Sequence, residues 1–561
     1  MTKSENYTSK DFLTTIFSIK RIRKIHLVAL SVLSGLLLSF AWPVGGFAPL
    51  LFIGFIPLFF VEDYICKNPI RFAKFASFRY AYLAFVVWNV LDTYWIYNST
   101  VVGAILAFLL NSAFMAITFQ VFHFVKKRLY SNKGGWTSLV AVWIAFEYLH
   151  FDWDLSWPWL DLGNGFASYH KWIQWYEYTG VLGGSTWILL SNILIFKLIT
   201  SFYDKELNVK SKALNRILTP VVIIIPIVIS FIIYSNTEDQ GDKASIIVTQ
   251  PNVDPYTEEF VISYNESINR NLIAAKEYLN DSTVLIACPE SAIQDYIWEN
   301  YLTDFNSVDT LQQFVNKYPE LSLIIGASTF YEYSSKVRPT NSARLMKETG
   351  RYYEAYNTAL FLRKGVAPMT YHKSKLVPGV EKMPFPHLTK PLQDLAFDLG
   401  GTVSTYGPNK YRTVFHSNDP RFKFAPIICY ESIYGEFVSR YVRNGANILV
   451  IITNDGWWGN TAGHRQHFEY ARLRAIETRR GVARSANTGT SGFFNQRGDI
   501  IKELGYEKYG ALQHDLRANN ELTFYVKHGD YLGKMFTFIS FFIILTSIVR
   551  WIINRKKKTA N

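Results

Sequence analysis

The sequence predicts two unlike parts: a polytopic α-helical membrane domain with about eight transmembrane helices, and a water-soluble α/β domain. Eight apolar runs are long enough, or nearly long enough, to cross a bilayer. Between the seventh and the eighth run, short apolar strands alternate with helical segments, which is the pattern of an α/β fold. The mean hydropathy of +0.05 is too low for a wholly embedded chain, so it averages an embedded part and a soluble part.

The composition narrows the class of protein. The 561 residues allow two or more domains, and their 49% apolar and 18% charged content departs from that of an ordinary soluble enzyme. The net charge of +13 could suggest nucleic acid, but the basic residues cluster between apolar runs, as in cytoplasmic loops. We therefore expect a membrane partner and no nucleic acid. Three cysteines, Cys66, Cys288 and Cys429, make no disulfide framework.

The apolar runs divide the chain. We expect a membrane domain over 1–235 with seven transmembrane helices, a catalytic domain over 236–530, and a last transmembrane helix with a basic tail over 531–561. Two of the runs are short and are the weakest candidates. The runs lie at about 25–42, 47–62, 76–91, 100–125, 136–150, 180–203, 217–234 and 534–553, with 47–62 and 136–150 the short ones.

Loop charges predict the orientation. Basic clusters flank alternate ends of the runs, whereas the intervening loops carry Asp92, Asp152, Asp154 and Asp161 with little basic charge. By the positive-inside rule both termini are then cytoplasmic, and the block 236–530 lies on the outer face. The clusters are Lys20 to Lys24, Lys67 to Arg79, Lys126 to Lys133, Lys205 to Arg216 and Arg555 to Lys558.

Three short stretches carry the candidate chemistry. Phe424 to Ser432 reads as a buried strand that ends at Cys429, and Val284 to Glu290 reads as a second strand that ends in a carboxylate. Tyr371-His-Lys373 supplies a cation between them in the sequence. A thiol at a strand end is by itself more often core packing, but base, cation and thiol together suit nucleophilic catalysis.

These stretches resemble the nitrilase (carbon–nitrogen hydrolase) superfamily, whose triad is Glu, Lys and Cys in that order. The closer resemblance is to the bacterial apolipoprotein N-acyltransferases, and it covers nearly the whole chain because that family also has several spans before the enzyme and one after it. The matching motifs are Pro289-Glu290-Ser291, Tyr371-His-Lys373, Leu376-Val-Pro378 with Glu381, Cys429-Tyr430-Glu431, Thr453 to Gly459, Gln466-His467 and Ala471 to Ala475.

The resemblance implies a fold and a reaction. The fold would be the nitrilase-type α-β-β-α sandwich. Cys429 would take an acyl chain from a phospholipid as a thioester and pass it to the α-amine of the S-diacylglyceryl-cysteine of an apolipoprotein. Glu290 would move the protons, and Lys373 would hold Glu290 and stabilise the oxyanion. The setting would be the bacterial inner membrane, with the enzyme on its outer face.

Further residues match supporting positions of the family: Glu381, Tyr430 and Glu431.

In two places the sequence departs from the family pattern. The usual Pro-Phe-Gly-Glu is replaced by Pro378-Gly-Val-Glu381, and a Trp near the acyl site is replaced by Tyr256 or Phe260. The reaction needs no metal or cofactor, and no Cys/His cluster has zinc-binding spacing.

Alternatives to the triad stay open at this point. Lys375 alternates to the same face as Lys373, and Cys288 lies in the strand of Glu290, where we interpret it as packing. A papain-like Cys–His pair could use one of three histidines, His372, His464 or His467.

Alternatives to the function also remain. They are a membrane-tethered amidase or nitrilase-type hydrolase, and a transporter or scaffold with a degenerate nitrilase domain. The Trp-rich segment 151–160 fits an aromatic belt at the headgroups or a wall of a lipid-access path.

Overall fold

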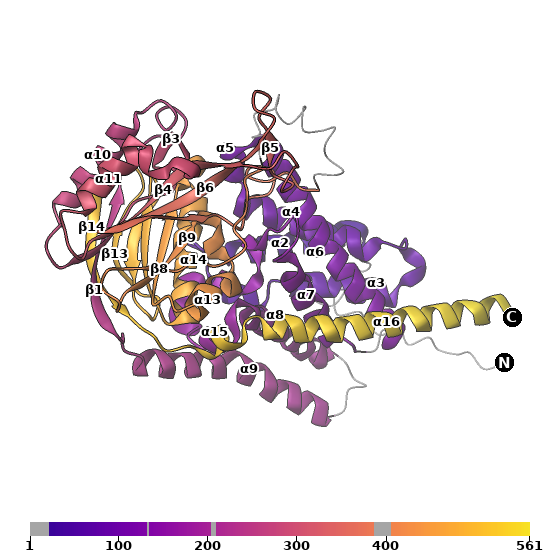
Figure 1. Ribbon diagram of the computed structural model, residues 1–561. Coiled ribbons are helices and arrows are strands. Elements are labelled where there is room, and N and C mark those ends of the chain that lie inside the picture. The colour runs from indigo at the N-terminus through magenta and orange to yellow at the C-terminus, as the bar shows by residue number, and fades with distance from the viewer. Residues whose placement is uncertain (1–21, 132–133, 204–208, 386–404, 561) are drawn as a thin grey trace, which may run out of the picture.

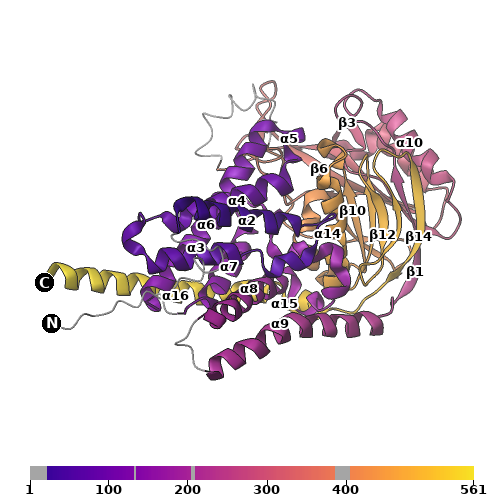
Figure 2. The same cartoon turned by 180° about the vertical axis from the view of Figure 1, so that it is seen from behind.

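The computed structural model describes residues 22–131, 134–203, 209–385 and 405–560. A bundle of helices and a pair of sheets lie side by side, and the last helix runs along the bundle away from the sheets (Figure 1, Figure 2). Among the basic residues that predict the orientation, Lys20, Arg21, Lys133 and Lys205 lie outside the described residues.

The helical part contains a helix at each of the eight apolar runs. In the part of the chain that the structure describes, five segments are able to cross a membrane by length and apolar composition: Ala48–Lys67, Val101–Leu129, Tyr176–Phe202, Val209–Asn236 and Tyr531–Lys557. The other three predicted spans form shorter or more polar helices, so the number of eight stays a prediction. The helices are α2 (Lys24–Phe40), α3 (Ile56–Lys67), α4 (Ala76–Thr93), α5 (Ile96–Ser99), α6 (Val101–Leu129), α7 (Thr137–His150), α8 (Tyr176–Tyr203), α9 (Val209–Asn236) and α16 (Tyr531–Ala560).

The rest of the chain is built on two sheets. The first has the strand order β14-β1-β2-β4-β6-β5, with β3 beside β4 and β7 beside β6, and the second has the order β13-β12-β11-β10-β9-β8. The first sheet consists of β1 (Asp242–Gln250), β2 (Thr283–Ala287), β3 (Ile293–Trp298), β4 (Ser322–Tyr333), β5 (Arg344–Leu345), β6 (Tyr352–Arg363), β7 (Val366–His372) and β14 (Gly510–Ala518). The second consists of β8 (Phe415–His416), β9 (Lys423–Ile428), β10 (Ile448–Thr453), β11 (Gly481–Ala486), β12 (Ser491–Phe494) and β13 (Ile500–Leu504).

Helices cover the outer face of each sheet. On β1, Ile246 and Val248 join the core that the two sheets share, whereas Ile247 packs with a separate cluster under α10 (Tyr264–Lys276) and α11 (Asn306–Val315). This alternation is what a strand buried on both faces requires. The second sheet is covered by α13 (Gly435–Arg443) and α14 (Ala462–Thr478), which separate it from the membrane helices (Figure 1). The layers are those of the expected α-β-β-α sandwich.

Helix α14 joins the two parts. Its Gln466 accepts a hydrogen bond of 2.7 Å from Nε1 of Trp159, and the hydroxyl of its Tyr470 accepts one of 3.1 Å from Nε1 of Trp42. These side chains are buried, and buried polar groups that are fully paired fix one relative placement. The face of the second sheet therefore has a defined position against the membrane helices.

Candidate active site

Cys429 lies at a sharp bend directly after β9. Its φ is +50°, a left-handed conformation that is unusual for a residue other than glycine. The Glu431 carboxylate holds the bend because its Oε2 accepts a hydrogen bond of 2.9 Å from the backbone N–H of Ile428. From the other side, the hydroxyl of Ser432 donates to the carbonyl oxygen of Cys429 at 2.8 Å. The thiol is thereby presented on a rigid backbone at the end of a buried strand.

Glu290 follows β2 and is 6% exposed. Its Oε1 accepts hydrogen bonds from Nζ of Lys373 at 2.9 Å and from Nδ2 of Asn357 at 2.7 Å. Its Oε2 accepts one of 3.0 Å from the backbone N–H of Asn454, which follows β10 in the second sheet. The carboxylate is therefore held from both sheets.

Lys373 follows β7 and is 1% exposed. Its ammonium group donates to Glu290 at 2.9 Å and to Oε1 of Glu381 at 2.7 Å. Burial lowers the pKa of Lys373, but the charges of Glu290 and Glu381 outweigh burial and hold that pKa well above its usual value. Lys373 is thus a fixed cation between two carboxylates.

Asn357 is a site residue that the sequence analysis missed. From the middle of β6 its Nδ2 donates to Glu290 and, at 3.2 Å, to Oε1 of Glu381. The sequence offered only a weak signal, because β6 also contains the polar residues Glu354 and Thr358. Oε2 of Glu381 accepts from the backbone N–H of Val377 at 2.9 Å, so Glu381 also ties down the start of its own loop.

The surroundings of Cys429 act on its pKa in opposite directions. The charge of Lys373 lowers the pKa of the thiol. Burial, followed by the charge of Glu290, is stronger and raises the pKa of the Cys429 thiol well above its usual value. The resting site therefore contains a thiol beside a carboxylate, and the proton must leave as the sulfur attacks.

The two residues after the thiol have different surroundings. Glu431 is fully buried, and its Oε1 accepts from the Tyr371 hydroxyl at 2.7 Å and from the backbone N–H of Ser374 at 2.6 Å. It therefore joins the Cys429 bend to the segment that carries Lys373. Tyr430 points the other way: its hydroxyl donates to the carbonyl of Ser156, and its ring stacks on Trp157 at 5.9 Å between centroids.

Two alternative residues of the sequence analysis lie elsewhere. Lys375 donates from Nζ to the carbonyl of Phe151 at 2.9 Å and pairs with Asp152 at 3.0 Å. Cys288 is fully buried in the cluster under α10 and α11, and burial raises the pKa of its thiol to about 12. Neither side chain contacts Glu290 or Cys429 through a hydrogen bond among the described residues.

Of the three histidines, one lies beside the thiol. His372 pairs with Glu299 at 2.7 Å, and His464 contacts Asn460 at 3.2 Å. His467 is different: one of its ring nitrogens lies within 4.8 Å of Sγ of Cys429 and of a carboxylate oxygen of Asp455.

Both nitrogens of His467 already have partners. Nδ1 contacts Oδ1 of Asp455 at 3.0 Å, and Nε2 contacts the Ser432 hydroxyl at 2.8 Å and the carbonyl of Cys429 at 3.2 Å. Arg484 completes the network with a bond of 2.6 Å to Oδ2 of Asp455. The sequence analysis did not find this network, which supports the backbone of Cys429 at its carbonyl oxygen.

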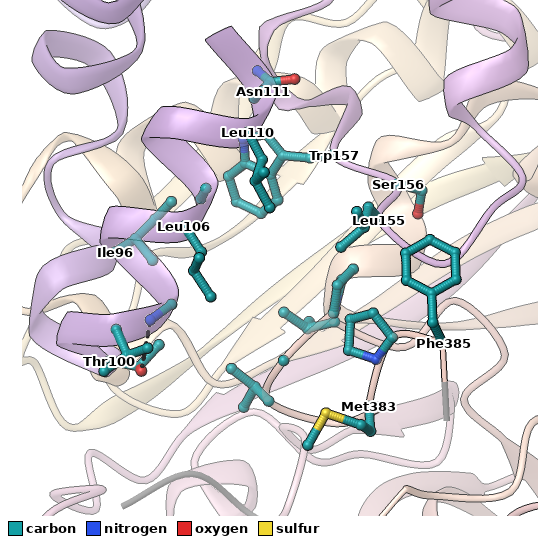
Figure 3. A pocket seen from close by; sticks show the side chains of 18 of the residues that line it. Ile96, Thr100, Leu106, Leu110, Asn111, Leu155, Ser156, Trp157, Met383 and Phe385 are labelled. Atoms are coloured by element: carbon teal, nitrogen blue, oxygen red, sulfur yellow. Dashed lines mark hydrogen bonds between the residues drawn. The ribbon is translucent and has the colours of Figure 1, made fainter. Parts of the chain in front are cut away.

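An apolar cavity of about 470 Å³ lies next to this site. It is formed by α6, by the Trp-rich segment 151–160 and by the loop that contains Glu381 (Figure 3). Trp157, which stacks on Tyr430, is part of its wall, so one aromatic layer separates the cavity from the residue after Cys429. The labelled side chains around it are mainly apolar: Ile96, Leu106, Leu110, Leu155, Trp157, Met383 and Phe385.

Tyr256, a residue at which the chain departs from the family pattern, contacts both parts of the molecule. Its hydroxyl oxygen lies 2.9 Å from the carbonyl oxygen of Asn98 in α5 and 2.7 Å from that of Trp457, so its one proton is shared between these two acceptors. Phe260 is 71% exposed and faces Trp457 at 6.4 Å between ring centroids.

Comparisons with known proteins agree with this arrangement. Residues 34–194 match the family model for the apolipoprotein N-acyltransferase N-terminal domain, and residues 247–520 match that for carbon-nitrogen hydrolase. An apolipoprotein N-acyltransferase of Chlorobaculum tepidum is 31% identical over 533 residues, which are 93% of this chain and 96% of that protein. One of Thermotoga maritima is 25% identical over 547 residues, covering 93% and 95% of the two chains.

One similar solved structure is Nit3 of Saccharomyces cerevisiae, which is described as a member of the nitrilase superfamily. It aligns with a TM-score of 0.34 and 18% sequence identity, and the alignment covers 50% of this chain and 92% of Nit3. The match to the carbon-nitrogen hydrolase family model identifies residues 247–520 as a nitrilase-type domain. With its membrane helices included, the chain belongs to the apolipoprotein N-acyltransferase family.

Proposed function

We propose that this protein transfers a fatty acyl chain from a phospholipid to the α-amine of the S-diacylglyceryl-cysteine of apolipoproteins, through a thioester on Cys429. The observation that supports this most strongly is the buried group of Glu290, Lys373 and Cys429, set against membrane helices with an apolar cavity beside it. A soluble hydrolase has no use for such helices. Both substrates, in contrast, are anchored in a membrane.

The first half-reaction forms the acyl-enzyme. Sγ of Cys429 attacks the ester carbonyl of the phospholipid while Glu290 takes the thiol proton. The ammonium of Lys373 stabilises the oxyanion that develops. When the tetrahedral intermediate collapses, the C–O bond breaks, and Glu290 returns the proton to the leaving alkoxide. The products are lysophospholipid and a thioester.

The second half-reaction transfers the acyl group to nitrogen. The free α-amine attacks the thioester carbonyl, Glu290 accepts a proton from the amine, and the C–S bond breaks. The proton then returns to the sulfur of Cys429, which restores the resting thiol. Because Glu290 shuttles the proton in both directions, a glutamine at this position is inactive in both halves.

The cavity is the place we assign to the acyl chain. Its wall is shared with a second apolar groove between α6, α7 and α16, since Phe114 and His150 line both. A chain could therefore extend from the lipid-facing side of the helices towards Trp157 and Tyr430. Met383 and Phe385 place the loop of Glu381 over the same cavity, so this loop would contact both the acyl chain and Lys373.

The proposed setting is the bacterial inner membrane with the enzyme on its outer face. The carbonyl of Leu129, at the end of α6 and beside the basic run Lys126 to Arg128, accepts from Arg550 near the end of α16. Two basic ends thus lie together, and α16 ends far from the sheets (Figure 1). The positive-inside rule puts this end in the cytoplasm and the sheets outside.

The two half-reactions can be separated experimentally. Purified protein given phospholipid alone should acquire an acyl adduct on Cys429, detected by mass and cleaved by neutral hydroxylamine. Adding a diacylated lipopeptide should then discharge the adduct onto the peptide amine. Cys429→Ala and Glu290→Gln should form no adduct, and Cys429→Ser should be nearly as inert because an alcohol is far less acidic than a thiol.

The matched control is Cys288→Ala, which should keep the adduct because that thiol is packed under α10 and α11. An adduct that maps to Cys288, or that forms unchanged in Cys429→Ala, would show that the proposed triad is wrong. An adduct on Cys429 that only water discharges would favour the tethered hydrolase. A folded wild-type protein that forms no adduct with any phospholipid would favour the transporter or scaffold.

A further inference from the structure

A second cluster of reactive side chains lies inside the helical part. Glu62 and Cys66 stand four residues apart on one face of α3, and His123 of α6 faces them. Oε1 of Glu62 is 2.9 Å from Sγ of Cys66 and 3.0 Å from Nδ1 of His123, and the sulfur is 3.7 Å from that nitrogen. None of the three residues is more than 8% exposed. Figures 1 and 2 both place α3 at the end of the bundle away from the sheets, so this cluster has no part in the proposed reaction.

We infer that Glu62, Cys66 and His123 form a binding site for a divalent transition metal ion. We take zinc as the ion with which to compare the geometry. A carboxylate, a thiolate and an imidazole are the side chains that bind zinc, and tetrahedral ligands of zinc stand about 3.4–3.6 Å apart. The sulfur and the imidazole nitrogen, 3.7 Å apart, are already close to that separation. Oε1 of Glu62 would move by about half an ångström to reach it.

The surroundings supply what a metal site needs beyond its ligands. Oε2 of Glu62 accepts a hydrogen bond from the buried ammonium of Lys126, which leaves Oε1 directed at Cys66 and His123. An outer partner of this kind orients a metal-binding carboxylate. Lys126 is held in turn by the ring of Trp136, 3.7 Å below its Nζ. The carboxylate therefore cannot turn away without leaving a buried cation unpaired.

A small pocket offers the fourth coordination position. It measures about 60 Å³ and is lined by Cys66, His123 and Ser77, among others. Oγ of Ser77 is buried and has no hydrogen-bond partner among the described residues, and the residue is 2% exposed. A water molecule on the metal would fill this space and hydrogen bond to that hydroxyl, since the pocket is large enough for water and polar on one side.

An ordinary ion pair does not account for the whole cluster. The pair of Glu62 and Lys126 satisfies both charges by itself. It gives no reason for a thiol and an imidazole to meet on the remaining oxygen, or for an unpartnered hydroxyl to face the space beside them. A metal ion explains the convergence of all four groups. Binding would release the thiol proton to solvent, so the affinity should rise with pH.

The test uses the detergent-purified full-length protein, stripped with a chelator and then titrated with Zn²⁺ or Co²⁺. We expect about one ion per chain, and for Co²⁺ a charge-transfer absorption that reports a thiolate ligand. Cys66→Ser should abolish this absorption and weaken Zn²⁺ binding by about 100-fold or more. Ser77→Ala should keep the absorption and weaken binding by about tenfold, as loss of an outer-shell partner does.

A measurement on the wild type avoids variants that fail to fold. Zn²⁺ should slow alkylation of Cys66 by iodoacetamide, as mapped by mass spectrometry, and should leave the rate at Cys288 unchanged. Unchanged alkylation of Cys66, or full Zn²⁺ binding by a folded Cys66→Ser variant, overturns the proposal. Protection of Cys429 alone, with binding lost in Cys429→Ala, would also overturn it, because the metal would then lie at Cys429, Asp455 and His467.

Discussion

At the residue scale, Gly326 determines how closely two strands approach at Glu290. A Cβ atom added at Gly326 would lie 2.5 Å from Cα of Glu290 and 2.6 Å from the carbonyl oxygen of Pro289. Both are backbone atoms, so a larger residue must displace the carboxylate itself. Displacing a catalytic group by about an ångström costs about 10- to 100-fold in rate.

We therefore predict that Gly326→Ala slows acyl-enzyme formation by at least about tenfold while the protein stays folded. The rate of adduct formation, followed by mass, is the measurement. Gly505→Ala is the matched control because its nearest neighbouring atom would be Cε of Lys508 at 3.9 Å. Wild-type rates in Gly326→Ala would mean that the position of Glu290 is not critical.

Glu259 is a further carboxyl group near Glu290. It is 5% exposed, and its Oε2 accepts from Nδ2 of Asn454 at 2.7 Å. Burial and then the charge of Glu290 raise the pKa of Glu259 from 4.5 to about 8. In the unfolded chain this group ionises near its ordinary value, so folding favours its protonated form.

This shift makes stability depend on pH with a defined sign. The contribution of Glu259 to the free energy of unfolding is complete below about pH 4.5 and is lost as the pH rises through about 8. The loss is at most about 5 kcal/mol. We predict that Glu259→Gln loses less thermal stability than the wild type between about pH 5 and pH 8.5. Melting curves at the two pH values test this, and Glu503→Gln, at an exposed position, is the control. Equal losses of thermal stability in the wild type and in Glu259→Gln would refute the prediction.

At the element scale, the loop from Val377 to Phe385 connects the cation of the site with the membrane part. Phe385 donates from its backbone N–H to Oδ2 of Asp154 at 3.0 Å, and Lys382 lies 3.6 Å from the same side chain. The loop and the Trp-rich segment are thus bound to each other, and together with α6 they enclose the cavity (Figure 3). The Trp-rich segment is therefore a wall of this cavity, and its role as a wall of a lipid-access path or as an aromatic belt stays a prediction.

A change on α6 tests the assignment of the cavity. Leu110 lines it, whereas its neighbour Leu109 is 44% exposed on another face of the same helix. We predict that Leu110→Trp lowers the rate of adduct formation about tenfold with long-chain donors and less with short ones, because the ring occupies the space of the chain end. Leu109→Trp should leave both rates unchanged. Equal effects on long and short donors would place the acyl chain elsewhere.

At the scale of the whole molecule, the orientation in the membrane can be read by labelling. Lys347 is exposed in the sheet part, and Lys127 is exposed at the end of α6. We predict that Lys347→Cys reacts with a membrane-impermeant maleimide in intact spheroplasts, and that Lys127→Cys reacts only after permeabilisation. The three native cysteines are buried and give a low background. Labelling of Lys347→Cys only in permeabilised cells would remove access to exported lipoproteins and contradict the proposed function.

Much of the fold could be predicted because it follows from local patterns. All eight apolar runs form helices, and β2 and β9 lie where the stretches that end at Glu290 and Cys429 predicted strands. Strands β3, β7, β13 and β14 mix buried with exposed positions, so their sequences do not stand out as apolar runs. The number of membrane crossings did not follow either, since helix length alone does not decide it.

By itself the sequence determined the order of Glu290, Lys373 and Cys429 and the places of Glu290 and Cys429 at the ends of strands, since these two strand ends are marked by local composition. Only the tertiary structure decided which groups surround them. Asn357 between two carboxylates and His467 beneath the thiol each depend on residues that are far apart in the chain. The pairing of Cys66 with His123 across two helices likewise cannot be read from spacing. Such contacts arise because packing, and not sequence proximity, brings buried polar groups to partners that replace water.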